Sequence, residues 1–181
     1  MSRQSTVSRP HVDAQPSTAA GNGRRSRPAL AYHRILVHVA TSAVSERAVV
    51  IAAQLASEHR AEVTLLNVIE VPKDLPLDAL FPDEEHEGRE ALRRATAILD
   101  RYGVDSKTRL TRSFSIAKAI LEAAAEANPE LIVMGAERHM RRQPSVFGHA
   151  ESIQEVLKAA PCRVMLVTPP AANGATKALS R

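Results

Sequence analysis

Glycine and arginine residues gather between positions 134 and 149, where together they could hold a phosphate group. Gly135 has no side chain, so a ligand could approach the backbone closely there. Gly148 and His149 stand where a helix is expected to begin, and the free N–H groups and dipole of such an end favour an anion. Arginines between the two glycines add positive charge: Arg138, Arg141 and Arg142. The segment predicts a phosphate-bearing ligand, with a solvated loop that binds nothing as the alternative.

These residues need a scaffold, and the pattern of apolar residues predicts one. Five short runs, most of them apolar and one polar enough for a sheet edge, are expected to be strands: 35–39, 63–69, 107–112, 131–134 and 164–167. Apolar residues at helical spacing predict four helices that include residues 44–55, 92–102, 116–123 and 153–160. The acidic stretch 71–87 is left unassigned, except that residues 83–85 are expected to form the first turn of the second helix. This alternation predicts an α/β fold, a doubly wound parallel sheet with helices on both faces.

In open α/β sheets, ligands bind at the carboxyl ends of the strands, where the helices change from one face to the other. Two segments of this chain leave that edge. The turn after 35–39 contributes Val39 and Ala40. The loop after 131–134 contributes the remaining candidate residues, Gly135, Arg138, Gly148 and His149.

Other chemistries have less support in the sequence. His38, His139 and His149 could meet near this edge and bind zinc, but no two of them have a compact ligand spacing, so no metal site is predicted. There is no Gly-x-Ser-x-Gly elbow, P-loop or HExxH motif, so we expect no enzyme activity, with slow nucleotide hydrolysis left open. Cys162 is expected to be buried as a small hydrophobic residue.

The net charge of +4 is unevenly placed along the 181 residues. Residues 1–34 carry six Arg and one Asp, and residues 169–181 add one Lys and one Arg, which leaves −3 for residues 35–168. We therefore expect a disordered basic arm (1–31), one folded domain (32–168) and a disordered tail (169–181). A mildly acidic domain is not expected to bind nucleic acid specifically. With one cysteine, no signal-peptide core and no run of about 18 apolar residues, the chain is expected to be cytoplasmic, without a membrane partner.

Three segments carry a resemblance to a known family: Arg34–Ser42, Leu131–Gly135 and Ala159–Val164. Over residues 34–168 the chain resembles the universal stress protein family. The resemblance implies a five-stranded parallel sheet of order 3-2-1-4-5, of the adenine-nucleotide alpha-hydrolase-like type. It also implies a homodimer formed through the last strand and a role in the stress response.

Family members that bind ATP carry a Gly, two residues, a second Gly, nine residues, and then Gly followed by Ser or Thr. They also carry an Asp at the end of the first strand. The spacing is kept here from Gly135 to Gly148, but Arg138 replaces the second Gly, His149 replaces the hydroxyl residue and Ala40 replaces the Asp. Arg138 could obstruct a phosphate or bind it. We therefore expect a degenerate cleft for ATP or a related adenine nucleotide.

Two hypotheses follow. The first is a regulatory stress-response module that binds an adenine nucleotide in this cleft. The second is a nucleotide-free dimeric module that recruits a protein partner, with the basic arm taking part. Because only 3% of residues are aromatic, any base is expected to be recognised by backbone and aliphatic groups.

Overall fold

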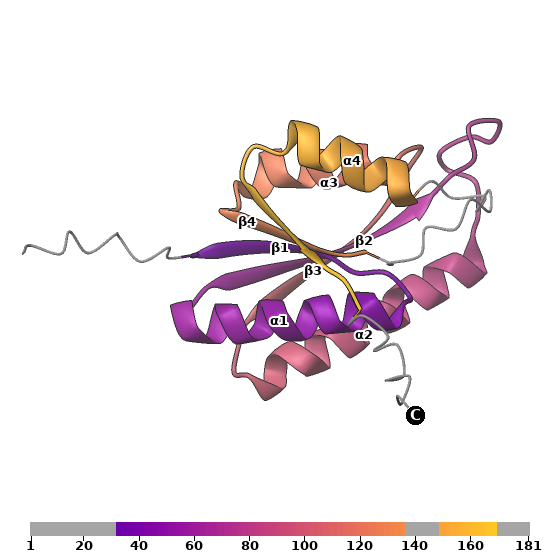
Figure 1. Cartoon of the computed structure of the whole chain (residues 1–181). Coiled ribbons are helices and arrows are strands. Elements are labelled where there is room, and N and C mark those ends of the chain that lie inside the picture. Colours follow the sequence, from indigo (N-terminus) through magenta and orange to yellow (C-terminus); the bar gives the residue numbers. More distant parts are fainter. Residues whose placement is uncertain (1–31, 137–148, 170–181) are drawn as a thin grey trace, which may run out of the picture. The chain divides into compact units, whose positions relative to one another are not determined.

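The computed structural model describes residues 32–136 and 149–169, in which strands and helices alternate along the chain (Figure 1). The elements are β1 (Arg34–His38), α1 (Ala43–His59), β2 (Glu62–Glu70), α2 (Pro82–Arg101), β3 (Ser106–Ser113), α3 (Ile116–Ala127), β4 (Leu131–Gly135), α4 (His149–Ala159) and β5 (Arg163–Val167). The strands are all parallel, in the order β3-β2-β1-β4-β5. The predicted doubly wound α/β fold and its strand order are confirmed.

Local signals explain where the helices begin and end. The Ser42 hydroxyl caps α1 by accepting a hydrogen bond from the backbone N–H of Ser45 (3.2 Å), and Ser115 caps α3 in the same way. Asn128, in the left-handed region at φ 45°, follows the last residue of α3. The described residues contain no helix long and apolar enough to cross a membrane.

Helix α2 begins earlier than its apolar pattern predicts. Pro82 is its first residue, and Asp83, Glu84 and Glu85 occupy its first turn. Proline suits this position because its fixed φ is helical and its missing N–H would have no partner there. Acidic residues suit it because the helix dipole is positive at this end. The stretch 71–87 is therefore irregular only as far as residue 81.

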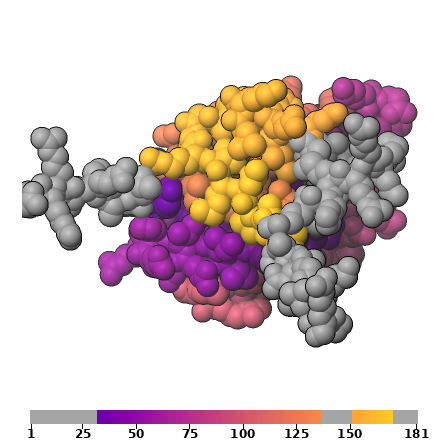
Figure 2. Space-filling view, viewed as in Figure 1, coloured from indigo at the N-terminus to yellow at the C-terminus, as the bar shows by residue number. Residues whose placement is uncertain are grey.

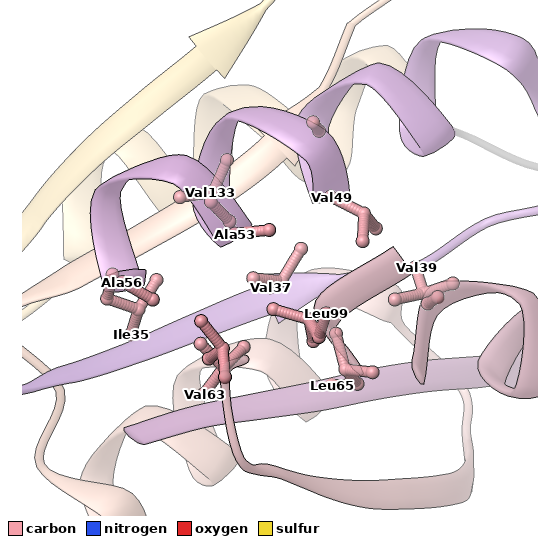
Figure 3. Close-up of a cluster of buried hydrophobic side chains, with 14 of the residues drawn as sticks. Ile35, Val37, Val39, Val49, Ala53, Ala56, Val63, Leu65, Leu99 and Val133 are labelled. Carbon is pink, nitrogen blue, oxygen red and sulfur yellow. The ribbon is translucent and has the colours of Figure 1, made fainter. Parts of the chain in front are cut away.

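Helices α1 and α2 cover one face of the sheet, and α3 and α4 cover the other (Figure 1). Alternate residues of the central strands supply the two cores: Val37 and Leu65 pack toward α1 and α2 (Figure 3), whereas Leu36 packs on the opposite face. Strand β5 is an edge strand, and together with α4 it lies on the face shown in the space-filling view (Figure 2). The two cores fix the ends of β1, β2 and β4 at one edge of the sheet.

Candidate functional site

The turn after β1 is held by hydrogen bonds to the start of α1. The backbone N–H of Ala40 donates to Ser45 Oγ (2.8 Å), and Ser45 Oγ in turn donates to the carbonyl of His38 (3.5 Å). Ser45 is buried, so these bonds are shielded from water. The Ala40 N–H is consequently occupied within the protein, and the turn offers a ligand its side chains and shape.

A second contact fixes the same turn from β2. The side-chain amide of Asn67 donates from Nδ2 to the carbonyl of Val39 (2.8 Å), and both residues are buried. Helix α2 crosses this amide at Gly88, where a Cβ atom would lie 2.5 Å from Asn67 Oδ1. The sequence reasoning missed both residues, although a polar Asn67 within the apolar run 63–69 was a visible signal.

Gly135, at the end of β4, lies against the first turn of α1. A Cβ atom there would be 2.9 Å from the backbone nitrogen of Ser45 and 3.0 Å from the carbonyl carbon of Val44. The close backbone approach expected at Gly135 is therefore made by α1. A close approach of a ligand to the backbone of Gly135 stays a prediction.

A pocket of about 360 Å³ opens at the carboxyl ends of β1 and β2. It is lined by residues of the β1 end and turn (His38, Val39, Ala40, Thr41), of β2 and the residues after it (Asn67, Val68, Ile69, Glu70, Pro72), of the start of α2 (Phe81, Glu84, Glu87, Gly88) and by Ile116. Predicted residues Val39 and Ala40 are thus brought together at a hollow of small-molecule size.

Phe81 is an aromatic residue of the pocket that the sequence did not indicate. The expectation that backbone and aliphatic groups recognise a base stays a prediction. Phe81 is half-buried and lines the pocket immediately before α2. Its place could not be read from the sequence, because residues 71–81 have no apolar periodicity. The pocket therefore has an aromatic group with the flat face that a base can stack on.

The remaining predicted residues belong to the loop after β4. Arg138 and Gly148 lie outside the described residues. His149 is the first residue of α4, and its side chain lies outside the description as well. Within residues 32–136 and 149–169, no group of three or more His, Cys, Asp or Glu is placed to hold a metal ion.

Comparison with known protein families identifies the family of this chain. Residues 31–168 match the sequence profile of the Universal stress protein family. The chain belongs to this family. No protein with a curated function matched the chain.

Solved universal stress proteins share the fold. A family member from Burkholderia pseudomallei is 25% identical with a TM-score of 0.59, over 75% of this chain and 96% of that one. A universal stress protein from Archaeoglobus fulgidus in complex with dAMP is 20% identical (TM-score 0.58; 75% and 98% covered). An Arabidopsis thaliana family member with AMP bound is 19% identical (TM-score 0.58; 77% and 93% covered).

The charges of the described pocket residues differ from those of a phosphate-binding site. Three carboxylates line the hollow, from Glu70, Glu84 and Glu87, and no Lys or Arg is among its described lining residues. Carboxylates accept hydrogen bonds from hydroxyl and amino groups and repel phosphate. The described part of the pocket is therefore suited to an uncharged group that carries hydroxyl or amino donors.

Proposed function

We propose that this universal stress protein binds an adenine nucleotide, with its nucleoside part in the pocket at the ends of β1 and β2. The observation that carries the proposal is the pocket itself, about 360 Å³ at the sheet edge where open α/β folds bind ligands. Two solved structures of the same fold hold dAMP and AMP, which supports this choice of ligand.

In this proposal Phe81 stacks on the base, and Val39 and Ala40 form another part of the pocket wall. Glu84 and Glu87 accept hydrogen bonds from the ribose hydroxyls or the base amino group, a role that the methyl group of Ala40 cannot fill. Arg138, Gly148 and His149 stay the predicted phosphate contacts.

Acid extraction of the purified full chain tests for a bound nucleotide, and thermal shift with adenosine, AMP, ADP, ATP and cyclic AMP tests for binding. We expect released nucleotide or a rise in Tm with at least one of these ligands. Empty extracts together with an unchanged Tm at millimolar ligand would overturn the proposal.

A matched pair of variants tests the pocket. Phe81→Ala removes the stacking group, and since stacking on one base contributes about 1–3 kcal/mol, Kd should rise roughly 5- to 150-fold. Phe81 makes no side-chain cap bond to α2, so its loss should leave the helix intact. Phe114→Ala removes an exposed aromatic residue outside the pocket and should leave Kd unchanged.

We also propose a homodimer formed through β5. Support comes from the apolar sequence of this edge strand, in which Val164, Met165 and Leu166 are all only half-buried. Such an edge is a template for pairing with another strand. Met165→Lys should convert the dimer to monomer in sedimentation velocity, whereas Leu157→Lys, an exposed site on α4, should leave the dimer in place.

A further inference from the structure

The connection between β2 and α2, residues 71–81, exposes three leucine side chains to solvent. Leu75 is 41% exposed, Leu77 44% and Leu80 85%. The connection is not a loose loop, because Leu75 N–H donates to the carbonyl of Pro72 and Ala79 N–H to that of Pro76, both at 3.0 Å. It lies beyond the end of β2 (Figure 1). Exposed leucines held by two turns and bordered by polar residues are typical of an interaction surface.

A groove of about 510 Å³ is lined by one of these leucines, Leu77, and lies between the connection, the start of α2 and the end of β3. Its apolar part consists of Ile69, Leu77 and Leu110. Glu85 lies in its wall and is paired with Arg89 and Arg112. The hydrogen bond from Arg112 is the main reason that the pKa of Glu85 is lowered, so this wall keeps its ion pairs at neutral pH. The groove thus offers an apolar floor between fixed polar walls.

The segment of the chain that carries the leucines is rich in acidic residues. Residues 71–87 contain six Asp or Glu and one Lys, a formal net charge of −5 with His86 neutral. Five of these acids form no ion pair with any residue of the described ranges: Asp74, Asp78, Asp83, Glu84 and Glu87. This charge favours a basic occupant and repels nucleic acid and anionic lipid surfaces.

We infer that the leucines of residues 71–81 and the adjoining groove dock a basic segment of a partner protein that carries apolar side chains. Leucines of the partner would fill the groove beside Leu77, and its Lys or Arg side chains would pair with Asp74 and Asp78. A second copy of this chain fits less well, because a symmetric contact would place the same acids opposite each other. The inference does not depend on nucleotide binding.

The test uses the full chain and a fluorescently labelled amphipathic peptide of Leu, Lys and Arg, followed by anisotropy. An otherwise identical peptide with Glu at the basic positions is the charge control. We expect the basic peptide to bind and the acidic one not to bind. Absence of binding by the basic peptide, or equal binding of both, would overturn the inference.

Two sets of variants locate the site. Combined Leu75→Ser, Leu77→Ser and Leu80→Ser should weaken binding at least about tenfold, since apolar burial contributes about 25 cal/mol per Å². Leu157→Ser, half-exposed on α4, is the matched control and should bind like the wild type. If the triple variant fails to melt cooperatively, Leu75→Ser with Leu80→Ser keeps Leu77 in the apolar floor of the groove and serves in its place.

Asp74→Asn with Asp78→Asn tests the charge outside α2, where the helix dipole is not changed. This pair should weaken binding at low salt and have little effect at high salt, because exposed charges are then screened. Wild-type affinity of the leucine variants or of this pair at low salt would contradict the inference. Tighter binding of a peptide of residues 1–31 would assign the surface to the chain's own arm, and loss of the dimer in the leucine variant would assign it to a second copy. Either result would overturn the partner proposal.

Discussion

Substituting Gly88 by alanine tests how closely α2 packs against Asn67 beside the pocket. The added Cβ atom would lie 2.5 Å from Asn67 Oδ1 and 2.9 Å from Leu110 Cδ1. The Leu110 methyl is the far end of a half-buried side chain and can turn aside. The Asn67 amide cannot, because its other end donates to the carbonyl of Val39 at 2.8 Å in the protein interior.

Two opposing effects set the size of the change. Alanine is favoured over glycine within a helix by about 1 kcal/mol. Overpacking costs about 1–3 kcal/mol, and a buried carbonyl that loses its donor costs a similar amount. We therefore expect Gly88→Ala to lower the free energy of unfolding by at least about 1 kcal/mol, against the usual direction of a Gly→Ala change in a helix.

A double-mutant cycle with Asn67→Ala, followed by urea denaturation, separates the two effects. Once the amide is absent, Gly88→Ala should be neutral or stabilising by up to about 1 kcal/mol, which gives a coupling energy of about 2 kcal/mol. Gly103→Ala is the control: Gly103 has φ +67° and no neighbour within 4 Å, so its cost should be equal in both backgrounds. An equal cost of Gly88→Ala in both backgrounds would refute the role given to Asn67.

Three further predictions concern residues at or next to the ends of strands β4 and β5. Gly135→Ala should lower the free energy of unfolding by about 2–3 kcal/mol in urea denaturation, because its neighbour at 2.9 Å is the backbone nitrogen of Ser45, which cannot rotate away. Burial alone would raise the pKa of Glu130. The hydrogen bond from the Arg34 backbone and the Arg34 charge outweigh burial, so the pKa lies below its ordinary value. The stabilising effect of Glu130 should be lost as pH falls through that lowered pKa, and Glu130→Gln should then match the wild type in pH-dependent melts. Burial raises the pKa of the half-buried Cys162 thiol, so mass spectrometry should show slower alkylation by iodoacetamide at neutral pH than for a free cysteine.

The fold could be predicted from the sequence because its central strands β1 and β4 are apolar on both faces. Residues 131–134 illustrate this: all four are apolar, and all four are buried between the two helix layers. The start of α2 could not be predicted from periodicity. Residues 83–87 carry only charged side chains and histidine, which are mostly exposed, so no apolar stripe marks the first turns of the helix.

The candidate site was predictable only where it depends on topology. Val39 and Ala40 follow from the rule that loops at the carboxyl ends of strands meet at one edge. Asn67, Gly88 and Phe81 depend on how closely α2 packs over β2, which is a matter of distances between elements. Sequence spacing contains no such distances, and a single polar residue within a strand signals only that a partner is needed.

The β2–α2 connection joins the two proposed binding surfaces. Phe81, Glu84 and Glu87 line the pocket proposed for the nucleotide, whereas Leu77 and Glu85 line the groove proposed for the basic segment. The adjacent residues Glu84 and Glu85 on the first turn of α2 thus line different hollows. If a bound nucleotide changes the affinity for the basic segment, the basic segment must change the affinity for the nucleotide by the same factor. If both proposals hold, residues 71–87 are the segment through which a bound nucleotide would change the affinity for the partner.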